Sequence, residues 1–198
     1  GVPDCSTSAT IPDVSSGSNN FPTISGTANV NNLFIESNAQ ISIGVSGNLN
    51  VCGNLENLGT ANIGVGTLTF LGTAIQTVSG AIEVTNMTMN NSGFGVVLDN
   101  TLTMGGSLTM TDGILYTTSD NLLVLTSSAT TAASNDASFV DGPIQRTGST
   151  DIIFPVGDGN YVANASLLNL SASETFTVQF FASGFTDTST TGELEVVS

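Results

Sequence analysis

A short pattern of alternating polar and apolar residues recurs along the first two thirds of the chain. Each copy has a polar residue, then Leu or Met, a variable residue and a bulky apolar residue. Because successive side chains of a strand point to opposite faces, the second and fourth positions are predicted to point inward and the third outward. The six copies lie in NLFIES (32–37), NLNVCG (48–53), TLTFLG (67–72), NMTMNN (86–91), TLTMGG (101–106) and NLLVLT (121–126).

We call this four-residue pattern the tetrad. The spacing of its copies along the chain predicts a stacked fold. Successive copies start at unequal but similar intervals, and repetition of this kind is typical of solenoids, in which each repeat contacts its neighbours. We therefore expect an all-β chain built as a right-handed parallel β-helix. A β-sandwich is the alternative that would explain the alternation, although not the recurring tetrad. The predicted inward ladder comprises Leu33, Ile35, Leu49, Val51, Leu68, Phe70, Met87, Met89, Leu102, Met104, Leu122 and Val124.

Further strands are expected between the tetrads. Thr, Ser, Asn and Gly make up nearly half of the chain, and Thr favours strands whereas Gly and Asn favour tight turns. The stretch SLTMTD (107–112) also matches the tetrad, so it is either a second strand of the same coil or a shift of register. This second set of strands is predicted at Ile41, Ile43 and Val45, at Ala61, Ile63 and Val65, at Ile82 and Val84, and at Val96 and Leu98.

The pattern divides the chain into three segments. Residues 1–26 contain three prolines and are predicted to form an irregular cover over the first rung, with one short strand at 9–11. Residues 27–136 hold the repeats. From residue 137 the tetrad is absent, and Asp-Gly turns alternate with short apolar runs, which favours a small antiparallel sandwich-like domain or cap over 137–198.

The charge of the chain limits its partners. There are 16 acidic residues against one Arg, with no Lys or His, for a net charge of −15. Nucleic acid and anionic membrane surfaces are excluded as partners because binding phosphate requires clustered cations. No stretch approaches the roughly 18 apolar residues of a membrane span, so membrane insertion is not expected.

The two cysteines allow two interpretations. A Cys5–Cys52 disulfide would tie the N-terminal segment to the second rung and stabilise the fold by about 4 kcal/mol on the chain-entropy model. Alternatively, Cys52 is a small buried apolar residue and Cys5 pairs with a residue upstream of Gly1, since Gly1 is not a natural start. Metal binding by two cysteines without histidine is not expected.

Catalysis is an alternative because parallel β-helices also include pectin-degrading enzymes. A polysaccharide lyase needs cations, and the chain offers only Arg146, for which a salt bridge to Asp141 or Asp151 is the favoured role. A glycoside hydrolase needs two carboxylates about 5 to 9 Å apart. Asp99, Asp112 and Asp120 would have to converge for this, and turn carboxylates bonded to local backbone are the preferred interpretation.

Calcium is the one ion that the sequence suggests. Asp158 and Asn160 flank Gly159 and could donate oxygen ligands. A simple Asp-Gly turn explains the same three residues, so we expect no cofactor and keep Asp158 and Asn160 as weak candidates for calcium.

Two phrases of the sequence resemble a module of large surface proteins that Gram-negative bacteria export by the type IX secretion system. The first runs through Gly1-Val2-Pro3, Thr10-Ile11-Pro12 and Phe21-Pro22 to residues 32–37, and the second is FVDGPIQRTGSTDIIFPVGDGNYV (139–162). The tryptophan-bearing start of that module is missing here, and so is the C-terminal sorting domain. The resemblance implies a β-helical, extracellular or cell-surface protein, adhesin-like or matrix-forming, and it implies no catalytic residue.

Together these features predict a non-enzymatic extracellular structural protein, either an adhesin stalk or the subunit of a self-assembling surface filament. Expected partners are further copies stacked head to tail, neighbouring domains of a longer chain, or surface glycans. The C-terminal run at 193–197 is a candidate strand for a neighbour's sheet. The alternative is a carbohydrate-binding module or β-helix glycoside hydrolase, although its usual aromatic platform would rest on Tyr116 and Tyr161 alone.

Overall fold

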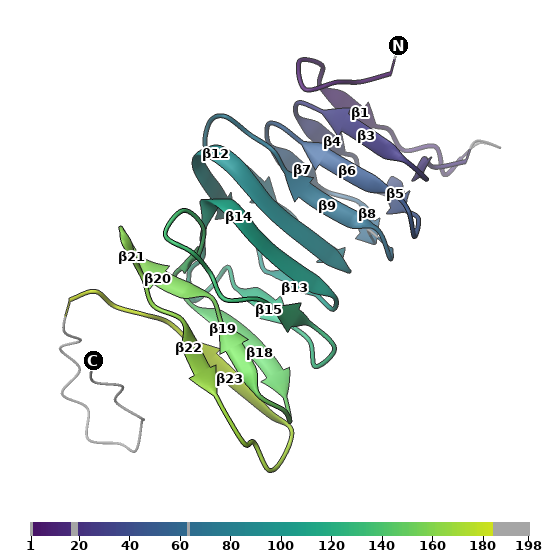
Figure 1. The fold of residues 1–198 in the computed structure, drawn as a ribbon. Helices are drawn as coiled ribbons and strands as arrows, with labels where there is room; N and C mark the ends of the chain where they lie inside the picture. Colours follow the sequence, from purple (N-terminus) through teal and green to yellow (C-terminus); the bar gives the residue numbers. More distant parts are fainter. Residues whose placement is uncertain (1, 17–19, 63, 184–198) are drawn as a thin grey trace.

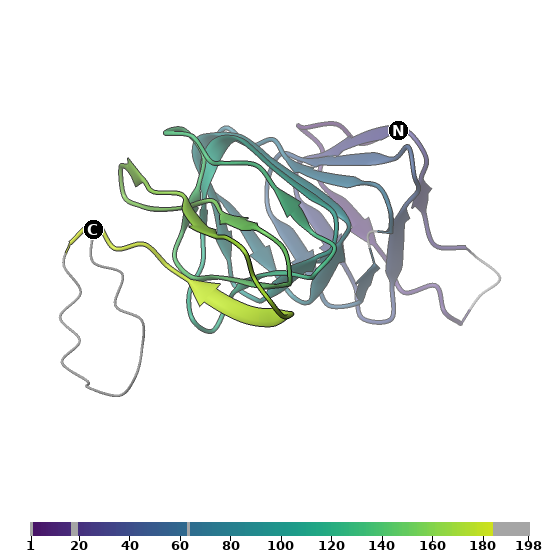
Figure 2. The ribbon, with the colours of Figure 1, turned by 60° about the horizontal axis from the view of Figure 1, so that its bottom comes forward.

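A computed structural model describes residues 2–16, 20–62 and 64–183, and shows an all-β solenoid of about six turns (Figure 1). Most strands pair in parallel with the strand one turn earlier and one turn later. The turns enclose one hydrophobic core bordered by three faces, which we call faces I, II and III (Figure 2). Within the described residues there is no helix, and hence none that is long and apolar enough to span a membrane.

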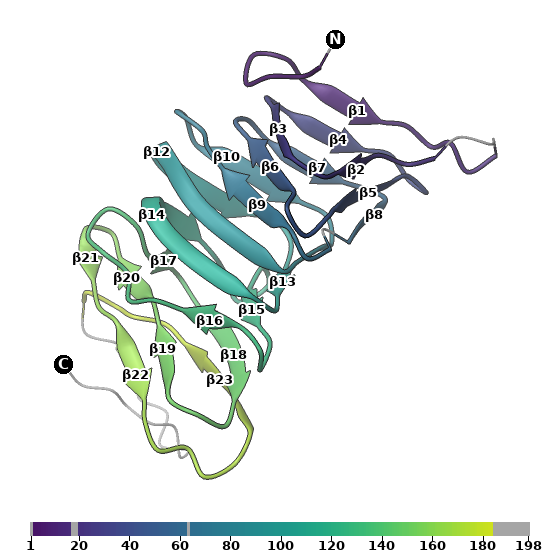
Figure 3. The same cartoon turned by 45° about the vertical axis from the view of Figure 1, so that its right-hand side comes forward.

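Face I is built from the strands that follow the turns at Gly26, Gly47 and Gly66, and their successors (Figure 3). Neighbouring strands pair in parallel and in register, so that Leu49 lies between Ala28 and Leu68. The strands are β3 (Thr27–Val30), β6 (Asn48–Val51), β9 (Thr67–Phe70), the first part of β12 (Asn86–Leu98), the first part of β14 (Ser107–Tyr116) and β16 (Thr130–Thr131).

Face II follows face I along each turn. β12 and β14 continue through the corner, so faces I and II belong to one sheet of 13 strands. The strands are β1 (Ala9–Ile11), β4 (Leu33–Ile35), β7 (Leu55–Asn57), β10 (Gln76–Ser79), the second parts of β12 and β14, β17 (Val140–Asp141), β20 (Val156–Asp158) and the antiparallel β21 (Tyr161–Val162).

Face III closes each turn with a separate sheet of eight strands. Ile82 pairs with Leu102 and Leu102 with Leu123, so inward residues of successive turns meet in register here as well. The strands are β2 (Thr23–Ile24), β5 (Gln40–Ile43), β8 (Thr60–Asn62), β11 (Ile82–Val84), β13 (Leu102–Met104), β15 (Leu123–Leu125), β18 (Ile144–Gly148) and the antiparallel β23 (Glu174–Val178).

The predicted inward residues are buried at ten of twelve positions, but the single ladder is wrong. Leu33 lies on face II against Leu55, Leu49 lies on face I against Leu68, and Leu102 lies on face III against Leu123. All three faces line the same core, and strands on each need the same alternation of inward apolar and outward residues. The buried members are Leu33, Ile35, Leu49, Val51, Leu68, Phe70, Met87, Met89, Leu102 and Met104.

The last predicted pair is out of register by one residue. Leu123 and Leu125 are fully buried, whereas Leu122 and Val124 are half-buried. Leu123 pairs with Leu102, and the backbone N–H of Leu102 donates to the carbonyl of Leu122. In an unbroken apolar run, no polar residue shows which side chains point outward. The pairing with the neighbouring strand therefore sets which side chains face the core.

The second tetrad in 101–112 is a separate strand on another face, since β13 closes one turn on face III and β14 begins the next turn on face I. Leu102 and Met104 face the core from face III, and Leu108 and Met110 do so from face I. Among the additional predicted positions, Val45 and Val65 are wrong, because both side chains are exposed at turns between faces III and I. Ile63 lies outside the described residues.

Both ends of the described part of the chain take part in the stack. β1 and β2 pair in parallel with β4 and β5, so they form a first partial turn of the solenoid. At the other end, parallel pairing continues past residue 137 through β17, β18 and β20. Only β21, β22 (Ala165–Leu167) and β23 among the described strands are antiparallel, and they cover β20, β19 (Ile152–Phe154) and β18 as a cap.

Candidate functional site

The three candidate aspartates for glycoside hydrolysis do not converge. Asp112 precedes the face II part of β14, whereas Asp99 follows β12 and Asp120 follows β14. A four-residue strand spans about 13 Å at about 3.3 Å per residue, so Asp112 lies across face II from the other two. Asp99 and Asp120 are exposed at turns of neighbouring coils. The arrangement provides no enclosed pair of carboxylates.

The turn at residues 158–160, the candidate calcium site, makes hydrogen bonds to other parts of the chain. The carboxylate of Asp158 accepts a bond of 2.8 Å from the N–H of Ala182, and that of Asp141 accepts one of 3.1 Å from the N–H of Gly159. Within residues 2–16, 20–62 and 64–183, no cluster of three or more acidic or cysteine side chains is positioned to hold a metal ion. Asp158 therefore ties the segment after β23 to the β20–β21 hairpin.

Arg146 lies inside the solenoid, and its predicted ion pair is not formed. Its guanidinium donates to the carbonyl of Ala129 at 2.6 Å and to the Thr131 hydroxyl at 3.0 Å, while its Nε has no partner. Burial lowers its pKa. Asp151 accepts instead from the N–H of Asn169. Arg146 pairs with Leu125 on one side and with Phe176 on the other, at an inward position of β18, so its hydrogen bonds connect the strands of the last turn.

The two tyrosines do not form a sugar-binding platform. Tyr116 lies half-buried on β14, and Tyr161 lies exposed on β21. Strands β17 and β20 separate them on face II. Burial, with the negative charge of Asp141 as a smaller cause, raises the pKa of Tyr116 above its ordinary value of 10.0.

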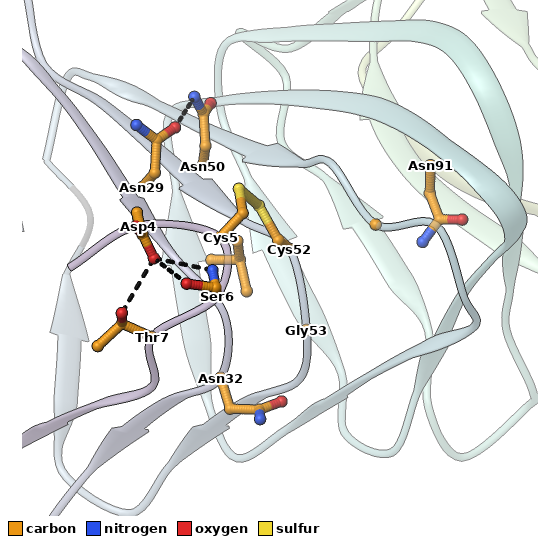
Figure 4. The surroundings of a disulfide bond; sticks show 12 residues. Asp4, Cys5, Ser6, Thr7, Asn29, Asn32, Asn50, Cys52, Gly53 and Asn91 are labelled. Carbon is orange, nitrogen blue, oxygen red and sulfur yellow. Dashed lines mark hydrogen bonds between the residues drawn. A yellow bond between two sulfur atoms is a disulfide. The ribbon is translucent and has the colours of Figure 1, made fainter.

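A disulfide joins Cys5 to Cys52, with 5.3 Å between their Cα atoms (Figure 4). Beside it, one oxygen of the Asp4 carboxylate accepts bonds of 2.9 and 2.7 Å from the N–H and hydroxyl of Ser6, and one of 2.9 Å from the Thr7 hydroxyl. These bonds, with the Ser6 hydroxyl first, lower the pKa of Asp4. The segment before β1 is thereby fixed to the turn that follows β6.

The disulfide borders a groove of about 410 Å³ at the corner between faces I and II. The amides of the groove connect successive turns: Asn32 accepts from the N–H of Asn54, and Asn54 accepts from the N–H of Thr77, at 2.8 and 2.9 Å. These side-chain amides accept hydrogen bonds from backbone N–H groups at the corner that are not bonded to a neighbouring strand. This role is structural. The groove is lined by Cys5, Asn31, Asn32, Cys52, Asn54 and Ile75, among others.

Further along the same corner, a fully buried amide network replaces the apolar core. Gln76 donates to the carbonyls of Val51, at 2.9 Å, and Gly53, and accepts from the N–H of Gly72 at 3.1 Å. Asn91 donates to Gln76 at 2.8 Å. Neither residue was predicted from the sequence to lie inside, because an inward amide interrupts the apolar alternation that indicates inward positions.

The same Asn91 organises the bulge in β12. Its side-chain oxygen accepts from the N–H groups of Gly93, at 2.7 Å, and Gly95, at 3.1 Å. Between these glycines, Phe94 has a φ of 77° and an exposed side chain. A left-handed backbone is costly for a bulky residue. The hydrogen bonds of Asn91 therefore stabilise a strained backbone that points the Phe94 side chain into solvent, where it adds nothing to the core.

The first turn leaves one edge of each of its strands open. Among the described residues, β1 pairs only with β4, β2 only with β5, and β3 only with β6. The N–H of Ala9 donates toward the stack, to Asn32, so the N–H of Thr10 points away from it. Half-buried Ile11, Ile24 and Ala28 lie at this end. It therefore offers both backbone groups and apolar surface to a further strand.

Comparison of the chain with protein-family models, with curated proteins and with solved structures gives no significant match.

Proposed function

We propose that this chain is a non-enzymatic structural module of an extracellular surface protein, serving as an adhesin stalk or as the subunit of a self-assembling filament. The main support for this proposal is the set of open strand edges in the first turn. They lie at the opposite end of the stack from the antiparallel cap (Figure 1). Contact with a second stack at this end would extend all three faces and satisfy the unpaired backbone groups.

The dimensions suit a spacer. About six turns at about 4.8 Å each give a rod of roughly 30 Å, and each further module in line would add a similar length. Ladders of side-chain hydrogen bonds connect successive turns, for example Asn50 to Asn29 at 2.8 Å and Thr69 to Asn48 at 2.9 Å. A rod of this kind separates what is attached to its two ends without needing a catalytic centre.

The disulfide supports an extracellular location. Disulfides persist in secreted and surface proteins and are rare in reducing compartments. Cys5–Cys52 fastens the segment before β1, which has few other contacts with the stack, so the first turn would depend on an oxidising environment.

Electron microscopy of the purified chain over a range of concentrations tests filament formation. Uniform fibres with an axial repeat near one rod length are expected for the filament subunit. Thr10→Pro removes a backbone donor at the open edge but leaves the bond from Ala9 intact, so it should shorten the fibres. Thr10→Val keeps the donor and serves as the control.

Monomers at every concentration would contradict filament formation. The stalk would then require the chain to lie within a longer protein, which the mass of the full-length precursor would show. Release of sugars from a polysaccharide would contradict the non-enzymatic role and favour the hydrolase. Hits on a glycan array without such release would favour the carbohydrate-binding module.

A further inference from the structure

Face I differs from the other two faces in carrying no charge. The strand segments 27–30, 48–51, 67–70, 86–89 and 107–110 contain no Asp, Glu, Lys or Arg, although the whole chain carries a net charge of −15. Face II presents Glu56, Asp141 and Asp158, and face III presents Glu83 and Glu174. In a strongly acidic protein, this neutral strip is a side on which the strands themselves bring no carboxylate against a second molecule.

Its outward side chains form two straight rows. Strand pairing places the members of each row on consecutive turns, about 4.8 Å apart. Hydrogen bonds within and between the rows, such as those of Asn50 and Thr69, hold the side chains in place. One row consists of Thr27, Asn48, Thr67, Asn86 and Ser107, and the other of Asn29, Asn50, Thr69, Thr88 and Thr109.

Exposed apolar side chains border the strip on both sides. Val45 and Val65 lie at the turns that precede β6 and β9, and Ile75 and Phe94 lie at the corner that follows face I. Val45 is 82 % exposed and Phe94 80 %. Four of the nine large apolar side chains that are well exposed among the described residues thus surround this one face. Clustered exposed apolar residues of this kind mark interaction surfaces.

We propose that face I is a lateral docking surface for a second copy of this chain, packed face to face. A second copy presents rows with the same spacing, so hydroxyl and amide rows can be matched along the whole rod, as in stacked sheets with Asn ladders. Two molecules with a net charge of −15 can approach closely only where no carboxylates are brought together, and face I provides that side.

The expected area indicates a weak interface. Four residues by five turns cover roughly 300 Å², less than half of the roughly 800 Å² per partner in a standard interface. The apolar borders add to this area, and screening of the remaining acidic surface by salt should strengthen the contact. This lateral contact is independent of the end-to-end contact proposed above, because it uses side chains of face I rather than the open strand edges.

Sedimentation equilibrium over a range of protein and salt concentrations tests the proposal. We expect a concentration-dependent dimer that strengthens with added salt. Thr88→Glu places a carboxylate on face I and should weaken dimerisation at least tenfold. Thr103→Glu adds the same charge at the equivalent outward position of face III, where dimerisation should change by less than twofold. Val45→Asp, at an exposed turn that borders face I, is a second variant and leaves the core intact.

Three results would overturn the proposal. One is a monomer at all protein and salt concentrations. Another is equal weakening by Thr88→Glu and Thr103→Glu in variants with the same melting temperature. The third is a monomer that is retained on a neutral polysaccharide and released by Val45→Asp, which would make a glycan the occupant of face I. Thr10→Pro should leave the lateral dimer intact, so failure of end-to-end assembly is distinguished from failure of this contact.

Discussion

The side-chain amide of Asn91 donates a hydrogen bond of 2.8 Å to the side-chain oxygen of Gln76, and both residues are almost completely buried. The two amides lie on adjacent turns at the corner between faces I and II. Every donor and acceptor of this pair is satisfied by the other amide or by backbone groups of the surrounding loops. The corner is therefore held by polar contacts where an apolar core would be expected.

Replacing Asn91 with Ala should destabilise the protein by about 3 kcal/mol, because buried groups left without partners each cost about 1 to 3 kcal/mol. The N–H groups of Gly93 and Gly95 and the carbonyl of Ala74 would lose their partner. Urea unfolding followed by circular dichroism measures the loss. Asn50→Ala removes one bond at a half-buried surface position and should cost less than about 1 kcal/mol. Equal costs for both variants would refute the special role of the corner.

Loss of the disulfide should loosen the first turn. Cys5 and Cys52 are separated by 47 positions, and a loop of this size corresponds to about 4 kcal/mol on the chain-entropy model. In the Cys5→Ser/Cys52→Ser double variant, amide exchange should accelerate at β1 and remain slow at β12 and β13. Reduction of the native protein should give the same pattern. Uniform acceleration along the whole stack would show that the disulfide does not act locally.

Leu122 and Leu123 provide a direct test of register. Leu123 is fully buried and Leu122 is half-buried. Leu123→Ala should therefore cost about 3 kcal/mol through loss of packing, whereas Leu122→Ala should cost less than about 1 kcal/mol. Thermal or urea unfolding of the two variants compares them. The opposite order would restore the register that the tetrad alone predicts.

Tyr116 should titrate above its ordinary pKa of 10.0, because burial and the nearby Asp141 disfavour its phenolate. A folded-state pKa above the unfolded value contributes stability that is fully present below pH 10 and is lost as the pH rises through the folded pKa. Absorbance titration of Tyr161→Phe, in which Tyr116 is the one remaining tyrosine, measures this pKa. Adding Asp141→Asn should lower it only in part, since burial is the larger cause. A midpoint at or below 10.0 would contradict the environment described for Tyr116.

The uneven spacing of the tetrads has a structural explanation. The longer steps join strands of the same face, as from Leu49 to Leu68. The shorter steps move from one face to another, from Leu33 on face II to Leu49 on face I and from Met87 on face I to Leu102 on face III. A single ladder was predicted because inward strand positions have the same composition on all three faces.

The class of fold follows from local patterns in the sequence. Alternation with a period of two, its recurrence and the supply of turn residues led to a parallel solenoid, because burying one side of many short strands requires that they stack around a shared core. Ten of the twelve residues named as inward are buried. These features depend on local periodicity, which a sequence displays directly.

Contacts between distant parts of the chain set the three faces, the register at Leu123, the burial of the Gln76 and Asn91 amides, and the position of Arg146 in the core. Each depends on a partner that is distant in the sequence, on another turn or another strand of the same turn. The same holds for the uncharged strip of face I, whose members are scattered along the sequence and are brought into rows by strand pairing alone. Polar residues satisfied across turns have no local pattern, so their burial is specified by the fold and not by the residues beside them.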